Sequence, residues 1–325
     1  MAAAPPPAAP PPAAPPPAAP AAAVQLVPAV TGPERQALPS RLRPGPGERI
    51  RRRASNGAIA MADLVALVAD QVTFYLRVLW SLPRGLRHRK EITTLVTEIA
   101  IGPGALVIGG GMFFVVMSIS FFTGTEVGLE GFAGLQQIGA QAFTGVISSL
   151  ANTREITPLV AGVALAAQVG AGFTSQLGAM RISEEIDALE VMSVDSFTYL
   201  VTTRVWAALA CMIPLYLAAL FASFIATQII VTWFFGLSLG VYLHYFHLFL
   251  PPIDIAYSFV KALVFTVAVT MIHCYYGYRA TGGPAGVGVA AGRAIRASII
   301  AVVLLNLLLS TLLFGGVNAT ARLVG

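Results

Sequence analysis

One short segment holds a third of the acidic residues of this chain. The chain has 15 Asp and Glu, and five of them lie in the stretch RISEEIDALEVMSVD, residues 181–195. They are Glu184, Glu185, Asp187, Glu190 and Asp195. Because acids near the start of a helix interact favourably with its dipole, we expect a helix here with Ser183 as its N-cap.

An apolar stripe accompanies these acids. It consists of Ile182, Ile186, Leu189 and Met192, which recur at helical spacing. The pattern predicts a short amphipathic helix over residues 183–192. Such a helix can be a solvated loop, can pack on its own subunit, or can dock into a soluble partner. A solvated loop helix needs no apolar stripe, and acids beside such a stripe favour docking.

Three polar side chains fall inside strongly apolar segments. Gln168 and Gln176 lie in or at the end of one apolar run, and Lys261 lies within another. Polar groups at membrane depth are costly and often functional, so we expect these residues to mark a polar pathway. Lys261 has a second interpretation, because a long side chain can extend its ammonium group to the nearer interface.

The chain contains no ATP-binding loop of its own. A P-loop needs Lys followed by Ser or Thr, whereas Lys90 precedes Glu91 and the other lysine, Lys261, precedes Ala262. If ATP drives this protein, a separate chain must hydrolyse it.

No metal-binding or catalytic constellation is expected either. His244 and His247 could share a helix face, but no cysteine or carboxylate cluster lies near them to complete a zinc site. Their aromatic neighbours favour a place at the membrane interface. Thr174 and Ser175 stand near no His and Asp pair that could activate a hydroxyl nucleophile. We therefore expect no metal, no catalytic residue and no cofactor in this chain.

Long apolar segments must position these residues. The chain is 56% hydrophobic and 11% charged, whereas a soluble protein is nearer a quarter charged. Five charge-free stretches cover 99–125, 156–180, 205–253, 262–278 and 297–321. Since a spanning helix needs roughly 20 mostly apolar residues, the sequence predicts an all-α polytopic membrane protein with about five transmembrane helices.

The spans are expected near 97–122, 156–178, 205–231, 255–278 and 297–315. Residues 233–250 are apolar enough for a sixth span, but their aromatic content also suits an interfacial segment, and five spans are preferred. The placement of Lys and Arg then predicts a multi-pass protein of the cytoplasmic (inner) membrane. The N-terminus and the 183–192 helix are expected in the cytoplasm, and the C-terminus outside.

The first 90 residues differ in composition from the rest. Residues 1–57 are rich in Pro, Ala and Arg, which predicts a disordered cytoplasmic tail. Residues 58–92 predict an amphipathic helix in the membrane interface, ahead of a membrane domain over 93–325. Residues 1–90 hold 12 Lys and Arg against four Asp and Glu, which suits an anionic membrane surface. No nucleic-acid module accompanies this charge, so we expect no nucleic-acid partner.

The apolar positions of the predicted interfacial helix include Leu64, Leu67, Val68, Val72 and Leu79. An ordinary amphipathic helix packed on protein is the alternative, but its place just before the first span favours the interface.

Small residues are frequent in the first two predicted spans. In the second they include Gly162, Gly170, Gly172 and Gly178. Small residues let membrane helices approach closely, either within one subunit or at a subunit interface or pathway, and both interpretations stay open. Cys211 and Cys274 fall within predicted spans, so we expect buried thiols and no disulfide.

The acidic segment and its surroundings resemble a known family. GFTSQLGAMRISEEIDALEVMSVDSFTYLVTTRVWA, residues 172–207, is similar to the signature of the MlaE/YrbE permease family. REITP at 154–158 and KALVFTVAVT…YYGYRATGGPAGVG at 261–288 extend the resemblance to residues 60–316. The chain departs from the family pattern at Gln176, where the family has an acid, and at Gln168, where it has a basic residue. Ser196 stands in place of a proline.

This resemblance implies the membrane subunit of an ABC-type lipid transporter, moving a fatty acid, sterol or phospholipid. The implied partners are a P-loop ATPase dimer, which binds ATP and Mg, and MCE-domain proteins. Residues 183–192 would then form the coupling helix on the ATPase. The implied contact residues are Ser183, Glu184, Glu185, Ile186, Asp187, Leu189, Glu190 and Met192.

The neutral residues at 168 and 176 suit a heterodimer with a second YrbE-like permease. This chain would be a B-type YrbE subunit of an actinobacterial Mce system. The alternative function is an envelope scaffold or channel without an ATPase. It predicts that charge reversal at Glu184, Glu185 and Glu190 leaves function intact, whereas an intramembrane enzyme is disfavoured.

Overall fold

The computed structural model describes residue 66 and residues 68–100 and 111–315. Tertiary contacts join these described residues into one compact unit. The expected tail over 1–57, the start of the predicted interfacial helix and the C-terminal residues from 316 on lie outside the described residues.

Within the described part of the chain, every regular element is helical, and five helices are long and apolar enough to cross a membrane. This confirms the predicted all-α polytopic fold. The five run over Met112–Gln136, Gln141–Ile182, Thr198–Phe234, Pro252–Tyr278 and Gly283–Phe314.

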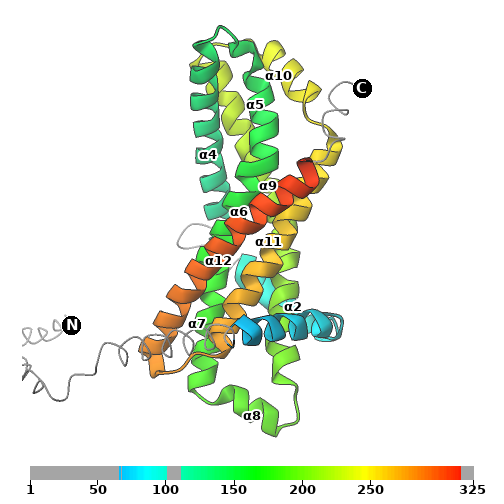
Figure 1. Cartoon of the computed structure of the whole chain (residues 1–325), viewed down its shortest axis with the longest axis vertical. Coiled ribbons are helices and arrows are strands. Elements are labelled where there is room, and N and C mark those ends of the chain that lie inside the picture. Colours follow the sequence, from blue (N-terminus) through cyan, green and yellow to red (C-terminus); the bar gives the residue numbers. More distant parts are fainter. Residues whose placement is uncertain (1–65, 67, 101–110, 316–325) are drawn as a thin grey trace, which may run out of the picture. The chain divides into compact units, whose positions relative to one another are not determined.

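The elements used below carry the labels of Figure 1. They are α2 (Arg89–Ala100), α4 (Gly111–Gln136), α5 (Thr144–Ala151), α6 (Thr157–Leu165), α7 (Ala171–Ile182), α8 (Glu185–Val191), α9 (Thr203–Ile229), α10 (Leu239–Leu248), α11 (Pro252–Tyr278) and α12 (Gly283–Phe314). The helix preceding α2 covers residues 68–85 and is called helix 68–85.

The spans extend further than the apolar runs that predicted them. The first differs most, because residues 97–100 belong to α2 and the spanning helix continues to Gln136 instead of ending near residue 122. The others also run past charged residues, and Arg154, Arg204 and Asp254 lie inside continuous helical segments. Partners within the protein hold these charges, so a charge does not end a helix here.

The second spanning segment is not a regular α-helix throughout. Two π segments interrupt it, η3 at Asn152–Ile156 between α5 and α6, and η4 at Ala166–Gly170 between α6 and α7. A π turn widens the helix, breaks the regular i to i+4 ladder and frequently occurs at functional sites. Both segments border the polar regions described below.

The helices pack closely around α9 and α11. In the bundle, α4 runs along α9, and α11 contacts α7, α9 and α12 (Figure 1). Their shared core includes the fully buried Met212, Tyr216 and Phe265. A Cβ added at Gly124 of α4 would lie 2.4 Å from the Ser223 carbonyl oxygen of α9, so glycine permits this close approach.

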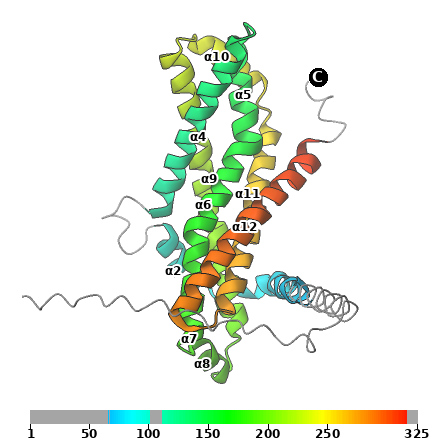
Figure 2. The same cartoon turned by 60° about the vertical axis from the view of Figure 1, so that its left-hand side comes forward.

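The two ends of the bundle carry different short helices. In Figures 1 and 2, α8 lies at one end, below α7, and α10 lies at the opposite end, beside α5. The ten-residue α10 is too short to span, and it packs Tyr242 and Phe246 against Phe132. The apolar run at 233–250 therefore caps the bundle, in agreement with the preference for five spans.

Helix 68–85 presents apolar residues on two sides. Phe74 and Val78 are buried in a cluster with Leu177 and Phe197 of the bundle. The predicted stripe lies elsewhere, because Val68, Val72 and Leu79 are exposed, and Leu64 and Leu67 fall outside the described residues. The neighbouring Trp80 is 84% exposed. One side thus binds the bundle, and the other offers an apolar and aromatic surface suited to the membrane interface.

Candidate functional site

A cavity of about 250 Å³, here called the Glu98 cavity, opens between α2, α4 and the second spanning segment. Its lining residues are Glu98, Ile99, Met112, Gln168, Val169, Gly172, Phe173 and Gln176. Gln168 and Gln176, both singled out from the sequence, therefore face one cavity. Lys261, the third residue of the predicted polar pathway, does not line it.

Helical spacing explains why these residues meet. Gln168 lies in η4, and Gly172 and Gln176 follow at intervals of four residues in α7. A Cβ added at Gly172 would meet no atom of the described residues within 4 Å, so among them this glycine faces open space. A Cβ at Gly170 would instead lie 2.5 Å from the His273 ring. Two of the glycines singled out from the sequence therefore differ in role. Gly170 permits close packing against His273, and Gly172 leaves room at the cavity.

A chain of polar contacts crosses the cavity rim. Gln176 Nε2 donates a hydrogen bond to Glu98 Oε1 at 2.6 Å, and Arg204 Nη2 donates to Gln176 Oε1 at 3.4 Å. The Gln176 amide therefore connects an exposed carboxylate to a buried guanidinium. Glu98 brings a carboxylate from α2 to the Gln176 side chain.

Arg204 is held by the protein and directed at this rim. It is 6% exposed, its Nη1 donates to the Leu200 carbonyl oxygen at 2.8 Å, and its guanidinium lies 5.7 Å from the Phe173 ring centre. Within the described part of the chain, its buried Nε has no hydrogen-bond partner. The buried charge makes this wall attractive to anionic or strongly polar groups.

Sequence reasoning missed Glu98 and Arg204 as members of this site. Each was used only as the boundary of a charge-free run. Their position at the edge of such a run was the available signal, because a charge bordering a span must find a partner or reach water.

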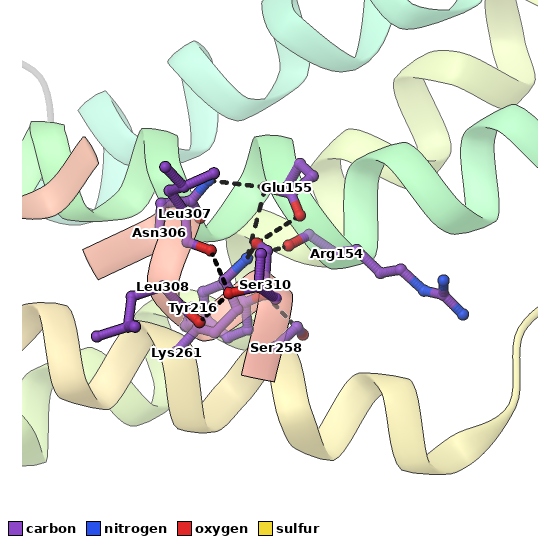
Figure 3. Close-up of polar contacts among 10 residues, drawn as sticks. Arg154, Glu155, Tyr216, Ser258, Lys261, Asn306, Leu307, Leu308 and Ser310 are labelled. Atoms are coloured by element: carbon purple, nitrogen blue, oxygen red, sulfur yellow. Dashed lines mark hydrogen bonds and ion pairs between the residues drawn. The ribbon is translucent and has the colours of Figure 1, made fainter. Parts of the chain in front are cut away.

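Lys261 belongs to a second polar region, shown in Figure 3. We call it the Lys261 cluster, and its members are Arg154, Glu155, Asp254, Lys261, Asn306 and Ser310. The Lys261 side chain is fully buried, and its Nζ donates to the Arg154 carbonyl oxygen at 2.5 Å and to Ser310 Oγ at 2.7 Å. It does not reach the protein surface.

The rest of the Lys261 cluster completes the bonding of its charges. Lys261 Nζ lies 3.6 Å from Glu155 Oε2, and Glu155 accepts hydrogen bonds from Asn306 at 2.7 Å and Ser310 at 2.6 Å. Arg154 pairs with Asp254 at 2.6 Å. Since a π turn disrupts the regular backbone ladder, the Arg154 carbonyl in η3 can accept from a side chain. The cluster thereby joins η3, α11 and α12.

Thr174 has a histidine neighbour, His273, which lies 99 positions away in the sequence. Its Oγ1 lies 2.8 Å from His273 Nδ1, and it is 3.1 Å from the His273 carbonyl oxygen. His273 Nε2 in turn lies 3.2 Å from Ser298 Oγ. All three side chains are buried, so the contact joins α7, α11 and α12 and presents no hydroxyl to a substrate.

The acidic helix α8 begins differently from the prediction. Glu184 is its N-cap, with a left-handed φ of 62°, and no side chain caps the helix. Ser183 Oγ donates instead to Glu185 Oε1 at 2.8 Å. The apolar stripe is also divided, because Ile186 is fully buried on the subunit, whereas Met192 is 64% exposed.

The acids of this segment divide into two groups. Glu184 and Glu185 are exposed at the tip of the bundle. Asp187 pairs with Arg181 at 2.6 Å, and Glu190 Oε1 accepts a hydrogen bond from Ser196 Oγ at 2.8 Å. The first group is directed at solvent, and the second fixes α8 to its own subunit.

Asp195 also has a local role. Its carboxylate accepts hydrogen bonds from Thr198 Oγ1 at 2.5 Å and from the Thr198 backbone N at 3.3 Å. Partial burial would raise the pKa of Asp195, but these hydrogen bonds outweigh it and hold that pKa below its ordinary value.

The other candidate ligands are dispersed. Among the described residues, no group of three His, Cys, Asp or Glu lies close enough to hold a metal ion. His244 and His247 are exposed on α10. Cys211 and Cys274 are buried free thiols, as the sequence predicted.

Comparison of the sequence with known proteins assigns this chain to a family. The family described as Permease MlaE matches residues 103–312. A probable ABC transporter permease protein of Rickettsia bellii is 33% identical over 209 residues, covering 64% of this chain and 81% of the relative. The intermembrane phospholipid transport system permease protein MlaE of Haemophilus influenzae is 26% identical over 228 residues, covering 70% and 85%.

A plant protein shows the same likeness. TRIGALACTOSYLDIACYLGLYCEROL 1, chloroplastic, of Arabidopsis thaliana is 28% identical over 208 residues, covering 64% of this chain and 59% of the relative. The family match includes α8, the Lys261 cluster and the cavity wall from Met112 to Gln176, but neither Glu98 nor helix 68–85. Since this match spans more than half of the chain, the protein belongs to the MlaE permease family.

Proposed function

We propose that this chain is the permease subunit of an ATP-driven lipid transporter, in which the Glu98 cavity receives lipid and α8 contacts a separate ATPase. The observation that carries the proposal is a cavity with a polar rim and an apolar wall among the membrane helices of an MlaE family permease. The names of the Rickettsia and Haemophilus relatives, an ABC transporter permease and a phospholipid transport permease, support it.

The Glu98 cavity has the chemistry of an amphiphile site. Glu98, Gln168 and Gln176 supply polar groups at the rim, while Met112 and Phe173 supply apolar surface. At about 250 Å³ it is smaller than a usual ligand pocket of roughly 300–1,000 Å³. It suits a headgroup and the start of an acyl chain, with the rest of the lipid in the bilayer. Fatty acids, sterols and phospholipids are the substrate classes.

The exposed part of α8 has the chemistry of a docking surface. Glu184 and Glu185 form an acidic ridge, and Val191 and Met192 add exposed apolar area, 86% and 64% exposed respectively. Charges steer association, and buried apolar side chains supply binding energy. A P-loop ATPase dimer is the proposed partner, with ATP and Mg bound there and not by this chain.

The remaining assembly follows the YrbE resemblance. A second YrbE-like permease would complete a heterodimer, and MCE-domain proteins would carry the lipid across the envelope. The proposed location is the inner membrane, with α8 and the N-terminus in the cytoplasm and the C-terminus outside.

A pull-down with the full chain as bait tests the ATPase contact. The variant is Glu184→Lys with Glu185→Lys, and Glu190 is left unchanged because its hydrogen bonds fix α8. The matched control is Glu126→Lys with Glu130→Lys, the same charge change on exposed residues of α4. We expect the wild type and the control to recover a P-loop ATPase and the α8 variant to lose it.

The second permease and the MCE-domain proteins should remain bound to the α8 variant. Recovery of the ATPase by this variant at wild-type level would contradict the coupling role of α8. Absence of an ATPase from every sample, under several mild detergents, would favour the envelope scaffold or channel instead.

A further inference from the structure

A second cavity, of about 630 Å³, lies between helix 68–85 and the adjoining ends of α7 and α11. It shares no residue with the Glu98 cavity. Three arginines and three aromatic residues dominate its lining, namely Arg77, Arg181, Arg279, Phe74, Phe197 and Tyr278. We call it the arginine cavity. Neither the family match nor the proposed function assigns a ligand to it.

The guanidinium group of Arg77 stacks on the aromatic ring of Phe197. Its guanidinium carbon lies 4.4 Å from the centre of the Phe197 ring. Stacking on an aromatic face fixes the plane of a guanidinium and leaves its N–H edge available. Among residues 68–100 and 111–315, no carboxylate lies within ion-pair distance of Arg77.

The other two arginines are held in place by acids but stay accessible. Arg181 pairs with Asp187 at 2.6 Å, and Arg279 Nη2 donates to Asp70 Oδ1 at 2.6 Å. Their side chains remain 38% and 49% exposed, so each retains donors for another acceptor. These acids, together with Asp195 near Arg77, offset much of the positive charge. Recognition therefore depends on converging N–H donors more than on net charge.

The position of the arginine cavity indicates which molecule could accept hydrogen bonds from its arginines. Helix 68–85 supplies Phe74 and Arg77 to the cavity, while its outer surface exposes Leu76, Leu79 and Trp80. A helix of this kind lies at the boundary between acyl chains and headgroups. Arginine donors in a cavity at that depth can bind the phosphate groups of lipids through charge-assisted hydrogen bonds.

We propose that the arginine cavity binds the phosphate group of a lipid headgroup, with Arg77 as the principal donor. The aromatic residues Phe74, Phe197 and Tyr278 cover the adjoining glycerol backbone. Such a lipid would join helix 68–85 to the bundle as a fixed component. The proposal requires only a membrane protein and does not rest on lipid transport or on an ATPase.

Native mass spectrometry of the full chain in mild detergent tests this inference. The probe is dioctanoyl phosphatidic acid, and dioctanoylglycerol is the matched ligand without phosphate. We expect phosphatidic acid binding with a component that Arg77→Gln weakens by about tenfold or more, because charge-assisted hydrogen bonds are lost. Arg84→Gln makes the same charge change at an exposed residue of the same helix, and we expect a change of less than about twofold.

Further variants guard against misfolding and misassignment. If Arg77→Gln elutes as an aggregate, Arg181→Gln replaces it, because this change removes one partly exposed ion pair, to Asp187, and such pairs contribute little to stability. Gln176→Leu in the Glu98 cavity should leave the Arg77-dependent component of phosphatidic acid binding unchanged. Equal binding of dioctanoylglycerol, or unchanged binding by both arginine variants, would overturn the proposal. Displacement by inorganic phosphate at concentrations equal to the lipid would assign the cavity to free phosphate and overturn the lipid source.

Discussion

The Lys261 cluster and the Glu98 cavity both border the second spanning segment, and they treat polar groups in opposite ways. The Lys261 cluster adjoins the π segment η3, and every charge in it is paired within the protein. The Glu98 cavity adjoins the π segment η4, and Glu98 and Gln168 remain exposed on its rim.

The comparison shows that two similar π segments, η3 and η4, can have different roles. At η3, a backbone carbonyl accepts from Lys261, and three elements are fixed together. At η4, the irregular turn places Gln168 beside open space left by Gly172. A polar residue in an apolar span therefore indicates rigidity when its bonds are saturated, and ligand binding when donors and acceptors remain open.

Removing the buried cation should have the largest effect on folding. Lys261→Met leaves the Arg154 carbonyl without its donor, whereas Glu155 loses its cation but keeps its hydrogen bonds from Asn306 and Ser310. We expect a loss of about 3 kcal/mol in unfolding free energy. Denaturant unfolding in detergent micelles measures it. Adding Glu155→Gln should recover part of the loss. Wild-type stability of the single variant would show that the cluster does not fix α12.

A pair of glycine substitutions sharpens the contrast between closed and open surfaces. Gly170→Ala places a Cβ 2.5 Å from the His273 ring, and overpacking of this kind costs about 1–3 kcal/mol. Gly172→Ala meets no atom within 4 Å in the part of the chain that the structure describes, and we expect a change within about 0.5 kcal/mol. The same unfolding measurement compares them. Equal losses in both variants would refute the assignment of Gly172 to open space.

Asp195 lies outside both polar regions, and the hydrogen bonds it accepts from Thr198 should make the stability of the protein depend on pH. Thr198→Val removes the hydroxyl that bonds Asp195, with an expected cost of about 1 kcal/mol at neutral pH. The folded-state pKa of Asp195 is lowered, so its stabilisation is present above about pH 4, the unfolded value. It is lost as the pH falls through the folded-state value. We expect a flatter pH dependence of stability in the variant, measured from pH 6 to 3.

A change at the rim of the Glu98 cavity should affect folding least. Gln176→Leu removes a partly exposed amide, and we expect a stability change within about 0.5 kcal/mol. Lipid binding, measured by copurification of labelled phospholipid, should fall by about tenfold because the link between Glu98 and Arg204 is broken. Ser175→Ala, at an exposed neighbour that does not line the cavity, is the control. Unchanged lipid binding with Gln176→Leu would remove this cavity from the pathway.

Some of the candidate site was predictable because it is local. Gln168 and Gln176 are eight residues apart on one helix, so sequence spacing places them on a shared face. The amphipathic character of α8 was likewise readable, and Ile186 and Met192 both belong to its predicted stripe. Spacing could not reveal which of them is buried, because that depends on the helices against which α8 packs.

The remaining partners come from distant segments. Glu98 is 78 positions from Gln176, and Arg204 is 28 positions from it, so neither contact follows from helical periodicity. The same holds for Lys261 and Ser310, which lie 49 positions apart on α11 and α12. Such contacts depend on how the helices cross.

The sequence by itself determined that this chain is an all-α membrane protein with five spans, because apolar length and missing charge follow directly from composition. Only the tertiary structure decided where the helices end and which polar groups remain open. Charged residues can lie inside a span when a partner from another helix neutralises them, and those partners are brought together by packing. The separation of Lys261 from Gln168 and Gln176 is the clearest instance.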